Sequence, residues 1–424
     1  CFFLFFFITQ SLTGSNSSIL CVGGGGGRPQ SLIGSGVPLV MLGVFKYFNF
    51  FISSFADAFG IQSITTLRII LPVGISFYTF QALSYVLDVS QHKIAAEKNF
   101  RKLALYISFF PQLVAGPIIK AADFLPQLDE ERNVTIKNIS TGMQIFVFGL
   151  FKKVVIADWL SVFVDDVFLT PKAFHAVSLI LGVMSYSIQI YFDFSGYSDM
   201  AVGCAKCLGY DFMRNFNMPY ISRNIREFWQ RWHISLSSWL KQYLYIPLGG
   251  NRKGAARTYF NNMITMLLGG LWHGAAWTFA VWGALHGIAL CVHKYYKQHF
   301  YKQHHGKNTA VGLVSIVLTN IFVAFCWIFF RADTFETARD LIYGIITWQE
   351  GIVQIYAWTI PAVFLVLLGT VYAVIKNKNH AKIDGIYPIL NLSSFWQLVI
   401  FFVEIGLIIG VGYTGANPFI YFQF

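Results

Sequence analysis

Long apolar segments recur along most of this sequence, and they constrain the fold more than any other feature. Many of them contain about 17 to 25 residues, the length a helix needs to cross roughly 30 Å of hydrocarbon. Backbone groups inside a bilayer must be satisfied without water, and these segments lack the alternating pattern of membrane β-strands. The sequence therefore predicts an all-α fold, a polytopic helical membrane protein. The expected spans are residues 37–56, 67–88, 103–119, 139–164, 176–194, 196–210, 258–276, 277–294, 310–330, 357–376 and 396–412.

Two of these spans, 103–119 and 196–210, are short and equally fit re-entrant or interfacial segments. The composition agrees with a membrane protein, because 55% of the residues are apolar and only 12% are charged. Soluble domains carry about 25% charged residues, so a soluble domain is excluded. The net charge of +11 is explained by the excess of Lys and Arg in cytosolic membrane loops, and no nucleic-acid partner is predicted.

The first 36 residues differ from the rest of the chain. They begin with a short apolar stretch, Cys1 to Ile8, and continue with a Ser- and Gly-rich region that includes Gly23 to Gly27. Such a composition has little to bury and behaves as a flexible coil. We expect residues 1–36 to be disordered, truncated or non-native, and residues 37–424 to form one transmembrane domain.

One long polar stretch, residues 210–260, is strongly basic. The positive-inside rule predicts that this stretch is a cytosolic loop. Its cations are Arg214, Arg223, Arg226, Arg231, Lys241, Arg252, Lys253 and Arg257, against the carboxylates Asp211 and Glu227 alone.

Three clusters place polar groups inside or beside apolar runs, where ionisable residues are functional candidates. The first contains Asp193, Ser195, Tyr197 and Asp199. On a helix Asp193 neighbours Tyr197, and Ser195 neighbours Asp199. We interpret this cluster as a structural site whose hydrogen bonds join helices.

The second cluster surrounds His233, in an amphipathic segment that would lie in the membrane interface or dip into it. The third contains His273, whose helical face would run through Ala276, Trp277, Ala280, Ala284 and Gly287, nearly all of them small residues. Such small residues admit either a close neighbouring helix or an empty passage.

His286 would point away from this face and is interpreted as a packing residue. Desolvation keeps an imidazole such as that of His273 neutral and able to accept a proton. General base, proton relay and structural residue all remain open for His273 on this pattern alone.

Other chemistries are less favoured. Cys204 and Cys207 have the spacing of a zinc motif but lack the further ligands that zinc requires, so no metal is predicted. The six cysteines show no disulfide framework and are expected to be buried thiols. The sequence has no Gly-x-Ser-x-Gly elbow and no phosphate-binding loop.

Several motifs together resemble the membrane-bound O-acyltransferase (MBOAT) family, and within it the alginate O-acetylation (AlgI-like) branch. They occur in order over most of residues 37–424, and several are long. The motifs are FFPQLVAGP (109–117), YFDFSGYSDM (191–200), EFWQRWHISLS (227–237), YIPLGGNR (245–252), GLWHG (270–274) and NPFIYFQF (417–424).

The resemblance implies a helical bundle with a central tunnel, in which His273 matches the family's active-site histidine and His233 its second histidine. It implies an O-acetyltransferase of the bacterial inner membrane, multi-pass, that uses acetyl-CoA as donor substrate and needs no cofactor. In that branch a periplasmic SGNH-type partner usually completes transfer to an envelope glycan. The expected substrate-binding residues are Arg226, Arg231, Trp232, Asn251, Arg252 and Trp272.

Two alternatives to this function remain at this point. One is a D-alanyl transferase of the same family, which takes its donor from a carrier protein. The other is a transporter without bond-making, in which the histidines relay protons.

Overall fold

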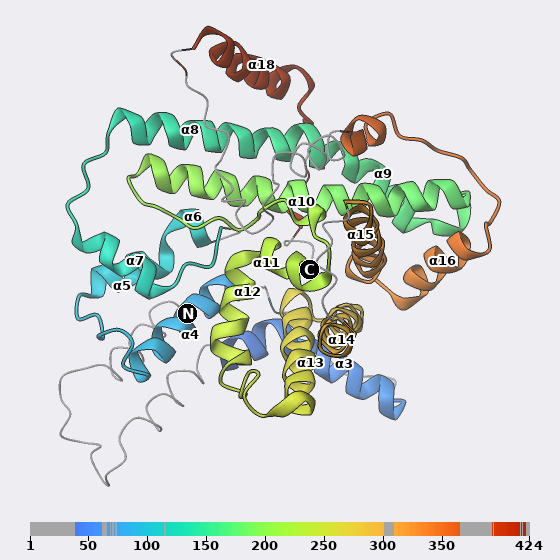
Figure 1. The fold of residues 1–424 in the computed structure, drawn as a ribbon, viewed down its shortest axis with the longest axis horizontal. Helices are drawn as coiled ribbons and strands as arrows, with labels where there is room; N and C mark the ends of the chain where they lie inside the picture. The colour runs from blue at the N-terminus through green and yellow to red at the C-terminus, as the bar shows by residue number, and fades with distance from the viewer. Residues whose placement is uncertain are drawn as a thin grey trace. The chain divides into compact units, whose positions relative to one another are not determined.

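The computed structural model describes residues 39–61, 74–113, 116–300, 309–364 and 394–415, together with single positions beside these ranges (66, 67, 69, 72, 392, 417, 419 and 420). The expected N-terminal segment 1–36 and most of the expected span 357–376 lie outside the described residues. Within the described ranges the chain is helical and forms no β-strand, apart from an isolated bridge between Phe174 and Ile352 (Figure 1). The predicted all-α fold is confirmed.

Among the described residues, three helices are long and apolar enough to cross a membrane: Leu39–Phe59, Ala176–Cys207 and Ala310–Arg331. A shorter apolar helix covers Phe395–Val411. These helices support the prediction of a membrane protein. The chain divides into two compact units, Cys1–Val134 and Thr135–Phe424.

The first unit contains the apolar helix Leu39–Phe59 and several shorter helices, of which α4 has 16 residues. The hydroxyl of Tyr106 donates to the backbone oxygens of Gln81, at 3.3 Å, and Ile119, at 3.0 Å, and so joins three segments of the unit. The expected span 103–119 forms two short helices, neither long enough to cross a bilayer. The elements of this unit are η1 (Gly43–Tyr47), α3 (Phe48–Phe59), α4 (Ile75–Ser90), α5 (Phe100–Ser108), α6 (Phe110–Leu113) and α7 (Ala121–Asp129).

The second unit is organised around α10, a helix of 32 residues. Helix α8 runs beside α10 in Figure 1, and the two backbones approach closely where Gly149 faces Gly196. The elements before and including α10 are α8 (Ile136–Phe151), η2 (Lys152–Ala157), α9 (Asp158–Leu169), η3 (Pro171–Ala173) and α10 (Ala176–Cys207). Those after it are η4 (Pro219–Ile221), α11 (Ile225–Arg231), α12 (Ile234–Leu240), η5 (Lys241–Tyr245), α13 (Gly254–His273), α14 (Trp277–His299), α15 (Thr309–Arg331), α16 (Phe335–Ile346) and α18 (Phe395–Val411).

Helix α10 corrects the expected pair of spans 176–194 and 196–210, because the chain continues through both as one helix. The polar residues that suggested a boundary do not break it. Lysine side chains from η2 pair with the α10 carboxylates Asp193 and Asp199. Because each carboxylate has a cation beside it and is not exposed to hydrocarbon, α10 can continue past both residues.

The region around His273 agrees with the expected boundary between the spans 258–276 and 277–294, but not with the helical face predicted across that boundary. Helix α13 ends at His273, the next residues Gly274 and Ala276 are extended, and α14 begins at Trp277. A single helical face from His273 to Gly287 therefore does not exist, and that prediction was wrong. A glycine is needed at this break, because a Cβ atom at position 274 would lie 2.0 Å from the ring of Phe279 and clash with it.

The small residues of this region serve helix packing. A Cβ atom on Gly270 would lie 2.4 Å from the backbone oxygen of Phe279 and 3.0 Å from the Cα of Gly283. Helices α13 and α14 therefore touch through their backbones at this point. Of the two interpretations offered by the sequence, the close neighbouring helix is the one observed here.

Candidate functional site

Two histidines that are distant in the sequence meet inside the second unit. His233 is the N-cap residue of α12 and His273 is the last residue of α13. Their ring centroids lie 6.4 Å apart. Both side chains are buried, with exposed fractions of 0% for His233 and 3% for His273. The fold therefore brings together the two residues predicted to be catalytic.

Aromatic rings surround the two imidazoles. The ring centroid of His273 lies 5.2 Å from those of Trp282 and Phe330, and 5.0 Å from that of Trp272. These rings, and not a face of small residues, are the neighbours of His273. These neighbours are apolar, and the two imidazoles lie away from bulk solvent.

His233 has its own polar support. Burial lowers the pKa of His233 to about 3, so this imidazole is neutral at any physiological pH. Its backbone is left-handed, with φ 42° and ψ 57°, a conformation that is uncommon outside glycine. The side chain of Asn215, which the sequence had not singled out, lies 3.0 Å from Nδ1 of His233.

His286 extends this buried cluster towards Trp229. Its Nδ1 accepts a hydrogen bond from Nε1 of Trp229 at 3.3 Å, and the ring is fully buried. The ring of Trp282 lies between the two histidines, with centroids 4.8 Å from His286 and 5.2 Å from His273. A continuous set of rings thus runs from Trp229 to His273.

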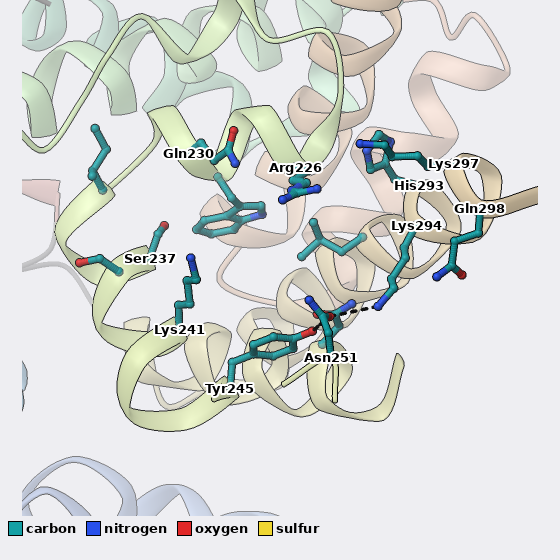
Figure 2. A pocket seen from close by; sticks show the side chains of 15 residues that line it. Arg226, Gln230, Ser237, Lys241, Tyr245, Asn251, His293, Lys294, Lys297 and Gln298 are labelled. Atoms are coloured by element: carbon teal, nitrogen blue, oxygen red, sulfur yellow. Dashed lines mark hydrogen bonds between the residues drawn. The ribbon is translucent and has the colours of Figure 1, made fainter. Parts of the chain in front are cut away.

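A basic pocket of about 790 Å³, shown in Figure 2, includes Trp229 in its lining. Cations from three elements face it: Arg226 of α11, Lys241 of η5, and Lys294 and Lys297 of α14. No carboxylate is among the side chains that line it. The lining residues are Arg226, Trp229, Gln230, Ile234, Ser237, Ser238, Lys241, Tyr245, Asn251, Asn262, Leu290, His293, Lys294, Lys297 and Gln298.

Hydrogen bonds order the rim of this pocket. Asn251 accepts two of them at Oδ1, one from the hydroxyl of Tyr245 at 2.6 Å and one from Nζ of Lys294 at 3.1 Å (Figure 2). Neither His233 nor His273 lines the pocket, but Ile234 does. Trp229 and Ile234 therefore form part of the wall between the pocket and the histidines.

The other predicted substrate-binding residues are distributed as follows. Arg226 and Asn251 line the pocket, whereas Arg252 is exposed outside its lining. Arg231 is turned inward, pairs with Glu227 at 2.9 Å and donates to the backbone oxygen of Asn217 at 3.2 Å. This arginine holds the loop before α11 and does not face the pocket.

The two predicted tryptophans are core residues beside the histidines. Trp232 is 1% exposed and Trp272 is 3% exposed. Trp232 packs against Phe216, with ring centroids 5.0 Å apart, and Trp272 packs against His273. Lys294 and Lys297 were not predicted, because they follow an apolar run and resemble the ordinary basic end of a span.

The polar cluster of α10 forms buried ion pairs with η2. Nζ of Lys153 lies 2.6 Å from Asp193 and 2.5 Å from Asp158, while Lys152 lies 2.5 Å from Asp199. The π-helical turn η2 carries both lysines, and their side chains reach carboxylates of α10. Such turns are rare in proteins. Sequence reasoning missed these lysines, although two adjacent cations inside an apolar run were a signal.

The remaining members of that cluster extend its contacts. Asp193 accepts the backbone N–H of Ile420 at 2.9 Å, and Asn417 donates to Asp158 at 3.0 Å. The Nζ atom of Lys153 lies 5.6 Å from the ring centroid of Tyr197, and Ser195 is fully buried. The cluster therefore fastens α10 to η2, α9 and the described C-terminal residues.

Metal coordination has no candidate among the described ranges, which contain no group of three or more His, Cys, Asp or Glu side chains arranged to hold an ion. Cys204 and Cys207 are present there as free thiols.

Comparison with known proteins gives a consistent family match. The family model described as MBOAT, membrane-bound O-acyltransferase family, matches residues 97–333, which include both histidines and the whole pocket. The probable alginate O-acetylase AlgI of Pseudomonas aeruginosa is 42% identical over 327 residues, covering 75% of this chain and 61% of that protein. The peptidoglycan O-acetyltransferase of Helicobacter pylori is 41% identical over 332 residues, covering 72% of this chain and 62% of that protein.

A more distant relative is the teichoic acid D-alanyltransferase of Bacillus subtilis. It is 28% identical over 282 residues, covering 62% of this chain and 69% of that protein. The chain spans less than two thirds of the length of the alginate and peptidoglycan relatives.

Proposed function

Because the chain belongs to the membrane-bound O-acyltransferase family, we propose that it is an O-acetyltransferase that passes an acetyl group from cytosolic acetyl-CoA towards hydroxyls of an extracytoplasmic glycan. Relatives named for O-acetylation are 41 to 44% identical, whereas two relatives named for D-alanyl transfer are 28 and 30% identical. The observation that carries the proposal is the meeting of His233 and His273, 6.4 Å apart, inside the region that matches the family.

In the proposed reaction His273 is the general base. It accepts the proton of the acceptor hydroxyl as the hydroxyl oxygen attacks the thioester carbonyl carbon. The carbon–sulfur bond then breaks, and the thiol leaves with the proton that His273 returns. His233 orients a substrate beside it, and the aromatic rings around both histidines keep water from competing as the acceptor.

We place the phosphates of acetyl-CoA in the basic pocket. Support comes from the four cations Arg226, Lys241, Lys294 and Lys297 together with the lack of any carboxylate in the lining. Phosphate oxygens form strong charge-assisted hydrogen bonds with Lys and Arg. Trp229 and Ile234 then separate the phosphate end of the donor from the histidines, and the thioester must displace part of this wall to reach His273.

The cellular location that we propose for the protein is the one expected for the alginate O-acetylation branch of the family. We propose the inner membrane of a bacterium as the location, with an alginate-like or other envelope glycan as acceptor. A periplasmic SGNH-type partner is proposed to complete the transfer. Deleting such a partner is expected to abolish glycan acetylation while leaving this chain in the membrane.

The pocket assignment predicts a change in donor affinity. Replacing Lys294 and Lys297 together by glutamine is expected to raise the KM for acetyl-CoA about tenfold or more, with little change in kcat. Each hydrogen bond to a charged phosphate contributes about 1.5–3 kcal/mol, and the bonds are equally present in the ground and transition states. The measurement is radiolabelled acetyl transfer by cell envelopes at varied acetyl-CoA concentration.

Two controls sharpen this test. Acetyl-pantetheine lacks the nucleotide phosphates, so its KM should be unchanged by the double substitution. Lys172→Gln removes an exposed lysine outside the pocket and should change neither KM. An unchanged KM for acetyl-CoA in the double variant would exclude the pocket as the phosphate site, and absence of any acetyl-CoA turnover by the wild-type protein would favour the transporter.

A further inference from the structure

Asn215 makes the closest polar contacts to His233, and it comes from a different segment of the chain. It lies between α10 and η4 and is 2% exposed. Its Oδ1 atom accepts hydrogen bonds from the backbone N–H of Ser235 at 3.2 Å and from the hydroxyl of Ser235 at 2.9 Å. The same oxygen lies 3.0 Å from Nδ1 of His233. On the other side, Nδ2 of Asn215 donates to the hydroxyl of Ser198 on α10 at 3.2 Å.

These contacts determine which way the amide of Asn215 points. A backbone N–H can only donate, so the Asn215 atom that faces the N–H of Ser235 must be the oxygen. The contact with Ser235 also gives α12 the N-terminal cap that its own N-cap residue, His233, does not provide. The orientation of Asn215 therefore follows from the backbone and does not depend on the imidazole.

The tautomer of His233 follows from that orientation. The amide oxygen of Asn215 has no proton to give, so the hydrogen in the 3.0 Å contact must belong to Nδ1 of His233. In a neutral imidazole one nitrogen carries the proton and the other holds the lone pair. The lone pair of His233 is therefore on Nε2.

Nε2 of His233 is buried and has no hydrogen-bond partner among the described residues. A buried polar atom without a partner is uncommon and calls for an explanation. The left-handed backbone of His233 is a second departure, and the backbone oxygen of Asn215 supports it by accepting the N–H of Ile234 at 2.8 Å. Backbone strain that neighbouring groups maintain in this way is concentrated at functional sites.

We propose that Asn215 is a positioning residue that holds His233 as the Nδ1–H tautomer, so that Nε2 accepts a hydrogen bond from the acceptor substrate. A lone pair binds O–H or N–H groups and cannot bind a thioester carbonyl oxygen. Of the two substrates it is therefore the hydroxyl-bearing one that His233 orients. The acceptor that meets the thioester at this site therefore offers an O–H group to Nε2 of His233, beside the hydroxyl whose proton His273 accepts.

This role rests on the proposed acetyl transfer, but the tautomer can be measured without it. In the full-length protein, labelled with ¹⁵N-histidine and reconstituted in lipid vesicles, solid-state NMR distinguishes a protonated ring nitrogen from an unprotonated one. A His233→Gln sample identifies the His233 signals by difference. The expected wild-type spectrum has a protonated Nδ1 and an unprotonated Nε2, and a protonated Nε2 would overturn the proposal without any change to Asn215.

The substrate role is tested by Asn215→Leu, which removes the amide oxygen at similar size. We expect the preference for Nδ1–H to be lost and the rate of acetyl transfer at saturating acetyl-CoA to fall about tenfold, the effect of one lost hydrogen bond to the acceptor. The KM for acetyl-CoA should not change. Asn217→Leu is the matched control, because it makes the same substitution two residues along the same loop.

Three results would count against the proposal. Retention of the Nδ1–H tautomer in Asn215→Leu would show that Asn215 does not set it. A rise in the KM for acetyl-CoA as large as the fall in the transfer rate would indicate a general loss of structure instead of acceptor positioning. No acetyl transfer by wild-type envelopes, together with an Nδ1–H signal, would refute the proposed function and the acceptor role while leaving the tautomer assignment in place.

Discussion

Replacing His273 with glutamine or alanine is expected to lower the rate of acetyl transfer by about 10²–10⁴-fold, the usual contribution of a general base. His273 lies at the end of α13 with its ring among Trp272, Trp282 and Phe330. These rings can hold a side chain of similar size but cannot accept a proton. Glutamine fills most of the imidazole volume, so its effect should report lost proton transfer more cleanly than the cavity left by alanine.

The measurement is acetyl incorporation from radiolabelled acetyl-CoA into glycan by cell envelopes, normalised to the amount of protein in the membrane. His299→Ala is the matched control, because His299 is an exposed histidine at the far end of α14. It should leave the rate unchanged. Normal acetylation by His273→Gln at wild-type protein level would remove His273 from the proposed mechanism.

The general architecture was predictable because it depends on segment length and apolar content. The helices around residues 39–59, 310–331 and 395–411 closely follow the expected spans. The ends of other helices were not predictable in the same way. The sequence around residue 195 looked like a boundary because it is polar, but the compensating cations are in η2, many residues earlier.

At His273 the error was the opposite one, because the helix ends there although the expected span continued to residue 276. Gly274, Ala275 and Ala276 continue the apolar pattern, so periodicity alone extended the helix through them. The extended backbone at Gly274 brings the ring of Phe279 against it, where no Cβ atom would fit. That constraint arises from tertiary packing, which a local pattern does not contain.

The candidate site was predictable where its residues lie in recognisable motifs. His233 and His273 were identified from their surroundings in the sequence, and the structure brings them together. Asn215 was not identified, because it lies in a loop with no motif and acts across the fold on another segment. The ion pair of Arg231 with Glu227 was not predicted either, because the sequence shows that both residues are charged but not that their side chains meet inside the protein.

The buried ion pairs of η2 make the second large prediction. Lys153→Met is expected to lower the stability of the protein by about 3–5 kcal/mol, since it leaves carboxylates buried without their cation. The side chains of Lys153, Asp158 and Asp193 are 8%, 7% and 3% exposed, so water cannot replace the lost lysine. The measurement is the thermal unfolding midpoint of the purified protein in detergent, which should fall by several degrees.

The cause of that loss can be separated from the loss of packing. Adding Asp158→Asn and Asp193→Asn to Lys153→Met removes the unpaired charges while keeping side chains of similar size, and should recover most of the midpoint because a neutral cluster has little desolvation penalty. Lys172→Met is the matched control: this lysine also contacts a carboxylate, Asp340 at 3.0 Å, but its side chain is 70% exposed. Exposed pairs contribute little, so its midpoint should barely move. If Lys172→Met and Lys153→Met lower the midpoint equally, or if the two asparagines restore nothing, burial of charge is not what makes Lys153 necessary, and the contacts of its methylene groups with α10 must be responsible.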